Sequence, residues 1–223
     1  MKDAPLLRGS LPVRLVALFG GLILFGFAIV FMLESRLGLP PWDVFHMGIA
    51  EHTPLSLGTI SILVGIVIMA VSWLAGSPPG FGTVANAIVI GLSINVLQSI
   101  PAIDRLSSSA LPIRVVLLAA GVLLFGVGSA FYIGAGTGAG PRDSLMLAIS
   151  RRTGKRIGLV RLTMEIIVLT IGVLLGGDAG IGTLALALLV GPIVELSFWI
   201  LLKLGLATPR RAGASEFGPL DAA

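Results

Sequence analysis

Six apolar runs divide the chain, and shorter segments rich in glycine, proline or charge separate them. The runs cover residues 15–33, 57–74, 83–99, 115–133, 157–175 and 183–202. Each is close to the roughly 20 residues that a helix needs to cross the hydrocarbon core of a bilayer. A membrane barrel would instead show short strands of alternating polarity. The pattern therefore predicts an all-α membrane protein with six transmembrane helices.

Two connections are longer than the usual link between helices. They lie between the first and second runs and between the fourth and fifth, and contain apolar stretches at residues 43–52 and 143–152. Each stretch is long enough for a short helix but too short to span a membrane. A glycine and a proline precede Asp43 and Asp143, which favours a helix start with the carboxylate as N-terminal cap. We expect two short helices, interfacial or re-entrant.

The second half of the chain repeats the first with a shift of 100 residues. Without any gap, identical stretches align at equivalent places: Leu24-Phe25-Gly26 with Leu124-Phe125-Gly126, Gly58 with Gly158, and Gly82-Thr83 with Gly182-Thr183. Such regular identity indicates a duplicated unit. Since each unit holds an odd number of spans, the second copy enters the membrane from the opposite side. The sequence predicts two inverted three-helix repeats, residues 15–103 and 111–203, each with a short helix between its first and second spans.

Composition agrees with a membrane protein. Hydrophobic residues make up 56% of the chain and charged residues 12%, whereas a soluble domain is usually about a quarter charged. The absence of cysteine excludes a disulfide, a thiol nucleophile and a thiolate metal site. The net charge of +4 lies in loops beside the apolar runs, so membrane lipids are the expected partners and nucleic acid is not.

The distribution of basic residues predicts the orientation. With residues 1–14 in the cytoplasm, the positive side chains of the inner face are Lys2, Arg8, Arg14, Arg142, Arg151, Arg152, Lys155, Arg156, Lys203, Arg210 and Arg211. Arg36, Arg105 and Arg114 face out. Residues 209–223 are predicted to form a disordered cytoplasmic tail. No small-residue cleavage site follows the first run, which argues against a secretory signal peptide.

Charged residues inside the runs are the main candidates for function, because an ionised group there costs about 2.5 to 3.5 kcal/mol on insertion scales. Arg161 and Glu165 lie one helical turn apart on the same face of the fifth run. They are expected to pair, unless Arg161 extends to the cytoplasmic interface instead. Glu165 lies too deep to reach the interface in this way and is the strongest single candidate for a functional residue.

Glu195 in the sixth run stands where the third run has Asn95. Glu195 is expected at a depth similar to that of Glu165, so the two carboxylates could face one cavity or share Arg161. For Asn95, and for Asn86 in the same run, hydrogen bonds between helices are the favoured role and solute binding is the alternative. Asp43 and Asp143 join the set because half-helices of inverted repeats commonly point their N-termini at a shared site. The candidate solute-binding residues are Glu165, Arg161, Glu195, Asn95, Asp43 and Asp143.

Other sequence patterns do not indicate a functional site. His46 and His52 lie six residues apart, on different faces of a helix, and form no zinc motif. The glycine-rich run at residues 134–140 follows a membrane span rather than a strand, so it does not predict dinucleotide binding. Small residues spaced by four, Ala87 with Gly91 and Ala187 with Gly191, predict close helix contacts in both halves. We expect no metal, no cofactor and no enzymatic activity.

The loop from Gly38 to Val44, with its Pro-Trp-Asp sequence, resembles the YczE/YyaS/YitT group of bacterial integral membrane proteins. Gly58 and the Ile-Gly-Thr sequence at residues 181–183 share this resemblance, which covers residues 15–202. It implies a bacterial inner-membrane protein. The group has no settled biochemical activity, so the resemblance implies no catalytic residue. Arg142 replaces Trp42 in the second copy of the loop, which argues against identical use of the two loops.

Two hypotheses of function follow. The first is a transporter or permease-like protein for a small solute, because inverted repeats, short broken helices and embedded charges are typical of secondary transporters. The second is a membrane scaffold or accessory protein that transports nothing, in which the buried charges only fix the register of the helices. The oligomeric state stays open.

Overall fold

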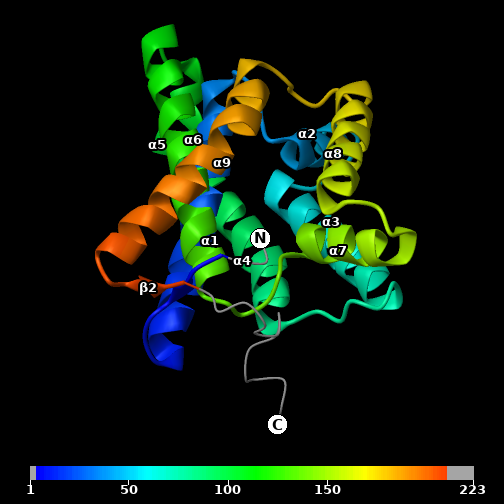
Figure 1. The fold of residues 1–223 in the computed structure, drawn as a ribbon. Helices are drawn as coiled ribbons and strands as arrows, with labels where there is room; N and C mark the ends of the chain where they lie inside the picture. Colours follow the sequence, from blue (N-terminus) through cyan, green and yellow to red (C-terminus); the bar gives the residue numbers. More distant parts are fainter. Residues whose placement is uncertain (1–3, 210–223) are drawn as a thin grey trace.

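The computed structural model describes residues 4–209, and most of them form helices (Figure 1). Within this part of the chain, six helices are long and apolar enough to cross a membrane. They are α1 (Leu11–Ser35), α3 (Leu57–Leu74), α4 (Phe81–Gln98), α6 (Leu111–Gly134), α8 (Ile157–Leu174) and α9 (Ile181–Lys203). The prediction of a helical protein with six spans is thus confirmed.

Shorter elements connect the spans. Helices α2 (Pro41–Ala50) and α7 (Pro141–Thr153) occupy the two long connections, where short helices were expected. The sequence pattern did not predict α5 (Pro101–Asp104), the 3₁₀ helix η1 (Arg105–Ser108), or the strands β1 (Leu6–Leu7) and β2 (Ala207–Thr208). The strands pair antiparallel and join the two ends of the described chain. The expected tail at residues 209–223 lies outside the described residues, apart from Pro209.

The predicted N-terminal caps are wrong. Pro40 and Gly140 precede the first helical residues, and neither cap involves a side-chain hydrogen bond. Asp43 and Asp143 lie inside the first turn instead. Proline occupies the first helical position in both helices because its fixed φ suits a helix start and its missing N–H leaves no donor unpaired. The carboxylates are therefore available for contacts outside their own helix ends.

Helices α1 and α6 pack side by side (Figure 1), and glycines bring their backbones into contact where they cross. A Cβ atom on Gly21 would lie 2.8 Å from the carbonyl oxygen of Gly128, and one on Gly128 would lie 2.8 Å from that of Gly21. Glycine is required at this crossing because any side chain would push the helices apart. Leu18, Leu22 and other fully buried apolar side chains surround the contact.

Arginines from each of these helices cap the end of the other. Arg14 in α1 donates from Nε to the carbonyl oxygen of Ala135 at 2.7 Å and from Nη2 to that of Gly136. Arg114 in α6 donates from Nε to the carbonyl oxygen of Ser35 at 2.7 Å. A cation at a helix C-terminus satisfies free carbonyls and interacts favourably with the helix dipole. The two contacts are related by a shift of 100 residues.

Other contacts recur with the same shift. The N–H of Gly82 donates to the carbonyl oxygen of Thr137, and that of Gly182 donates to Leu37. The hydroxyl of Thr83 donates to Ala139, and that of Thr183 donates to Leu39. The helix pairs follow the same rule: α2 packs on α8 and α7 on α3, while α4 packs on α1 and α9 on α6.

One helix pair breaks this rule. Helices α3 and α4 pack tightly, whereas α8 and α9 make almost no contact. A Cβ on Gly58 would collide with Gly91 and Asn95, but a Cβ on Gly158 or on Gly191 would meet no described atom within 4 Å. The small residues at 87 and 91 thus make the expected helix contacts, and that prediction is wrong for Gly191. In Figure 1, α8 lies with α2 and α7, apart from α9.

Candidate functional site

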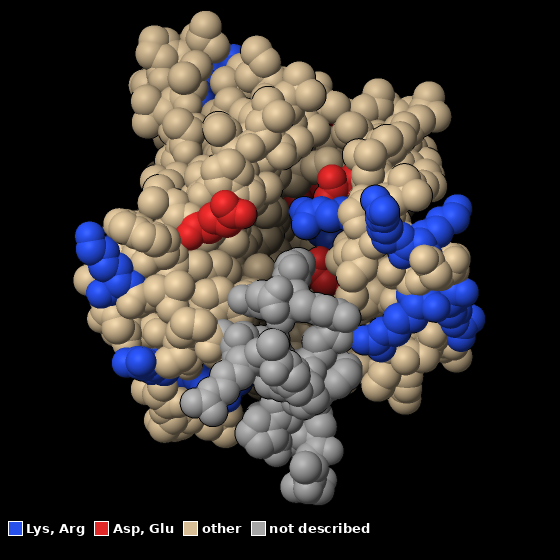
Figure 2. Space-filling view, in the orientation of Figure 1, with Lys and Arg blue, Asp and Glu red and all other residues tan. Residues whose placement is uncertain are grey.

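A cavity of about 830 Å³ lies where α8 stands away from α9. Its wall includes residues of α2, α3, α4, α6, α7, α8 and α9, so most of the bundle contributes to it. Figure 2 shows the surface hollowed on this face, with acidic and basic side chains around the opening. The volume is within the range typical of small-molecule sites.

Four of the predicted site residues border this cavity: Arg161 and Glu165 from α8, Glu195 from α9 and Asp143 from α7. The structure therefore brings together charges from three consecutive helices. Asn86, on α4, also borders the cavity. Asp43 and Asn95 do not.

Asn95 instead joins two helices. Its Nδ2 donates to Oγ1 of Thr59 at 3.1 Å, and its Oδ1 accepts from Oγ of Ser56 at 2.8 Å. Both partners lie at the start of α3. This is the interhelical role that the sequence favoured for the asparagines over solute binding.

Arg161 and Glu165 pair along α8. The Nε atom of Arg161 donates to Oε1 of Glu165 at 2.9 Å, so the expected ion pair is present. The side chain of Glu165 is 33% exposed and that of Arg161 is 53% exposed. Because both border the cavity, a solute there could reach either charge.

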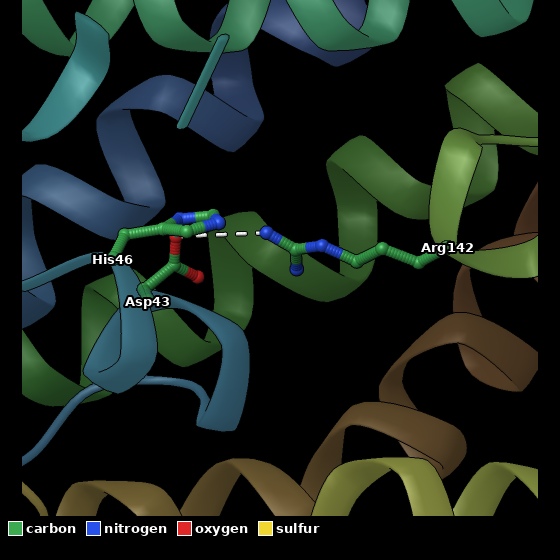
Figure 3. A network of polar contacts seen from close by, with 3 residues as sticks. All are labelled: Asp43, His46 and Arg142. Atoms are coloured by element: carbon green, nitrogen blue, oxygen red, sulfur yellow. Dashed lines mark hydrogen bonds and ion pairs between the residues drawn. The ribbon is translucent and has the colours of Figure 1, made fainter. Parts of the chain in front are cut away.

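Asp43, His46 and Arg142 form a network beside the cavity (Figure 3). Asp43 and His46 come from α2 and are almost fully buried. Oδ1 of Asp43 lies 3.2 Å from Nδ1 of His46 and 3.8 Å from Nη2 of Arg142, which extends from α7. The guanidinium of Arg142 also lies 5.0 Å from the ring centre of Trp42. The network thus joins the two short helices.

Protonation in this network is set by burial and by charge. Desolvation by burial opposes ionisation of Asp43, but the hydrogen bond from His46 and the charge of Arg142 outweigh it and lower the pKa of Asp43. Burial lowers the pKa of His46 despite the attraction of Asp43. The pair therefore consists of a carboxylate and a neutral imidazole whose Nδ1–H donates to Oδ1.

Two atoms of the network have no hydrogen-bond partner among residues 4–209. They are Oδ2 of Asp43 and Nε2 of His46. A buried polar atom without a partner is costly, so such an atom beside a cavity points to a ligand. His46 itself borders the cavity, as do Trp42, Tyr132 and Arg142.

Sequence reasoning missed these four residues as site candidates. The Asp43–His46 spacing of three residues was a usable signal, because it puts both side chains on one helix face. Arg142 was visible as a departure from the repeat, but nothing in the pattern placed it against Asp43. Within the described part of the chain, no group of three or more His, Asp or Glu residues is arranged to hold a metal ion.

The fold and the site define a multi-pass helical membrane protein whose helix bundle encloses a charged cavity. The chain belongs to a family of unknown function, DUF6198, whose family model matches residues 12–198. Membership agrees with the resemblance that the Pro-Trp-Asp loop predicted.

Individual relatives support the same assignment. The chain is 34% identical over 217 residues to "Uncharacterized membrane protein YczE" of Bacillus subtilis (strain 168), covering 96% of this chain and 99% of that protein. It is 38% identical over 170 residues to an "Uncharacterized protein" of Haemophilus influenzae, covering 76% of each. To "Uncharacterized protein YyaS" of Bacillus subtilis it is 24% identical over 186 residues, 80% of this chain and 92% of the relative. No solved structure matches.

Proposed function

We propose that this protein transports a small solute across the bacterial inner membrane and binds it in the cavity between α8 and α9. One observation carries the proposal: α3 is closed against α4, while the equivalent pair α8 and α9 is open around a charged cavity. A scaffold does not require two equivalent helix pairs to adopt different states. A transporter does require such a difference, because it exposes its site to one side of the membrane at a time.

The proposed architecture is an inverted repeat of residues 15–103 and 111–203. The recurring contacts support it, because Arg14 bonds to the end of α6 just as Arg114 bonds to the end of α1. Exchanged contacts of this kind are expected when a two-fold axis relates two units. With three spans in each unit, that axis lies in the plane of the membrane.

The repeats give the transport step a simple form. In the proposed opposite state, α8 closes on α9 as α3 now closes on α4, and α3 opens from α4. Gly158 and Gly191 are already small enough for this contact, because their equivalents Gly58 and Gly91 make it in the first repeat. The solute site then faces the other side of the membrane.

The proposed orientation places both termini in the cytoplasm. Basic residues cluster at the C-terminal end of α7, at the start of α8 and after α9, which favours the inner face for these positions. Arg161 and Glu165 lie in the first half of α8, near that face. The cavity would then open toward the cytoplasm in the described state.

The decisive experiment uses full-length protein in two formats. A broad panel of solutes is screened for thermal stabilisation of the purified protein, and every stabilising solute is tested for uptake into proteoliposomes. We expect at least one solute to do both, and expect Glu165→Gln to reduce its uptake at equal protein content. No stabilising solute and no uptake across the panel would overturn the proposal.

The alternative is a scaffold or accessory protein. The pairing of Arg161 with Glu165 within α8 favours it, since a neutral pair on one helix also lowers the cost of inserting that helix. The paired change Arg161→Met with Glu165→Gln separates the hypotheses. A scaffold keeps its cellular phenotype with this change, whereas a transporter loses it at normal expression.

A further inference from the structure

The charges around the cavity do not balance. Arg161 faces Glu165 at 2.9 Å, and Arg142 faces Asp43 at 3.8 Å, so each arginine of the cavity wall has a carboxylate. Asp143 and Glu195 also border the cavity, but within residues 4–209 neither side chain has a hydrogen bond or an ion pair. Burial raises the pKa of Asp143, and the more distant charges of Arg161 and Arg142 oppose that rise. The wall therefore has an excess of negative charge.

His46 adds an independent indication of the ligand. His46 borders the cavity, its Nδ1–H is directed at Asp43, and its Nε2 lies on the opposite side of the ring from that hydrogen bond. The residue is 1% exposed, and Nε2 has no partner among the described residues. In the neutral imidazole this nitrogen accepts a hydrogen bond. The cavity wall therefore contains a buried acceptor that has no donor among the described residues.

The rest of the wall is largely apolar and aromatic. Phe25, Phe125, Trp42, Tyr132, Phe198 and Trp199 border the cavity. Aromatic faces attract cations and pack against apolar groups. A small hydrated metal ion gains no packing contact from such a wall, whereas an organic cation packs its apolar groups against it.

We propose that the solute is a protonated amine with an apolar body, whose charge is balanced by Asp143 and Glu195 and whose N–H group is accepted by Nε2 of His46. An anionic solute would have to take Arg142 or Arg161 from its present carboxylate. A protonated amine displaces no existing contact. This inference rests on the proposed function for the identity of the site, but it is tested by binding rather than by flux.

The test compares three probes of similar size: 2-phenylethylamine, 2-phenylethanol and 3-phenylpropionate, which are positive, neutral and negative at pH 7. Each is titrated into full-length protein in nanodiscs, with empty nanodiscs as the blank, and binding is measured by calorimetry and by tryptophan fluorescence. Trp42 and Trp199 border the cavity and report on its occupant. We expect the amine to bind at least tenfold more tightly than the other two. Equal or tighter binding of the alcohol or the carboxylate would overturn the inference.

Variants then locate the site. Glu195→Gln and Asp143→Asn are each expected to weaken amine binding at least tenfold, and Glu195→Asp to keep it within about threefold. Glu51→Gln, an exposed carboxylate away from the cavity wall, serves as the control and should leave binding unchanged. If Gln and Asp at position 195 weaken binding equally, charge balance is not the cause and the inference fails.

The outcomes separate this inference from the transport proposal. Amine binding that depends on Glu195, without uptake of any solute into proteoliposomes, would support the amine site and overturn the transport proposal. Uptake of a neutral or anionic solute, without amine binding, would support the transport proposal and overturn the amine site.

Discussion

Asn95 donates a hydrogen bond from Nδ2 to Oγ1 of Thr59 at 3.1 Å, and this bond ties α4 to the start of α3. A shift of 100 residues leads from Asn95 to Glu195 and from Thr59 to Leu159, which cannot form the same bond. The difference coincides with the open gap between α8 and α9. Two side chains thus mark which of the equivalent helix pairs is closed in the described state.

This asymmetry can be measured directly, because the chain has no cysteine and labels can be placed freely. Spin labels at Ile66 and Ile88 report on α3 and α4, and labels at Ile166 and Leu188 report on α8 and α9. All four side chains are exposed, so labelling should not disturb the core. Double electron–electron resonance is expected to give a longer and broader distance for Ile166–Leu188. A transported solute should then shorten that distance and lengthen the first; two similar distances without solute would contradict the open and closed pairs.

The second prediction gives α9 the missing hydrogen bond. The double change Leu159→Thr with Glu195→Asn copies the residues of the closed pair into α8 and α9. A hydrogen bond between membrane helices contributes about 0.6 to 2 kcal/mol. We therefore expect the population with α8 close to α9 to rise by about threefold to thirtyfold. The same spin labels measure this, with Leu159→Thr alone as the control, and an unchanged distribution would show that this bond does not set the state.

Hydrophobic length made the fold predictable, and the reason is physical. A bilayer fixes the length of apolar helix that must cross it, so the run at residues 57–74 predicted α3 at its observed ends. The short helices were also placed within two residues of their observed starts, because proline and glycine restrict where a helix begins. Such signals are local, so they can be recognised in a sequence without knowing how the helices pack.

The candidate site was predictable in its charges but not in its geometry. Glu165 and Arg161 were found because ions in apolar runs are rare. Asn95 and Glu195 looked equivalent by position, yet one lies in a closed helix contact and the other beside a cavity. That difference depends on the separation of two helices, which periodicity does not encode. Arg142 was missed for the same reason, since it reaches Asp43 from a different helix. His46 was missed although its spacing from Asp43 on α2 was a local signal.

The third prediction concerns the crossing of α1 and α6. A Cβ on Gly21 would lie 2.8 Å from backbone atoms of α6, whereas one on the adjacent Gly20 would meet nothing within 4 Å among the described residues. Gly21→Val should therefore destabilise the protein by about 1 to 3 kcal/mol or more, because a well-packed contact cannot absorb the extra atoms. Gly20→Val is the matched control, with the same loss of backbone freedom. Unfolding in sodium dodecyl sulfate compares the two, and equal stability of both variants would contradict the close crossing.

The fourth prediction tests the exchanged arginine caps. Arg14→Lys and Arg114→Lys keep the charge but lose the fork that bonds two carbonyl oxygens at once. Each is expected to lower the free energy of unfolding by about 1 to 2 kcal/mol, since hydrogen bonds from charged groups contribute about 1.5 to 3 kcal/mol and part is retained. Similar losses at both sites are expected from the recurring contacts. A loss at only one of them would show that the two caps are not equivalent.

The last prediction concerns the contact between the two short helices. Asp43 is fully buried, and Arg142 supplies the nearby positive charge at 3.8 Å, with about a third of its side chain exposed. Removing that charge with Arg142→Met leaves a buried carboxylate with His46 alone, which should cost about 1 to 3 kcal/mol of stability. Asp43→Asn in the same chain should restore most of the loss, because an amide oxygen still accepts from Nδ1 of His46 and carries no charge.

Stability of the wild type, the two single variants and the double variant forms a cycle that isolates the coupling between the two side chains. Arg8→Met, which removes an exposed arginine, is the control for general loss of charge. A coupling near zero would show that Arg142 does not stabilise the Asp43 carboxylate. A coupling of about 1 kcal/mol or more would show that the charge of Arg142 stabilises Asp43 across the gap between α2 and α7.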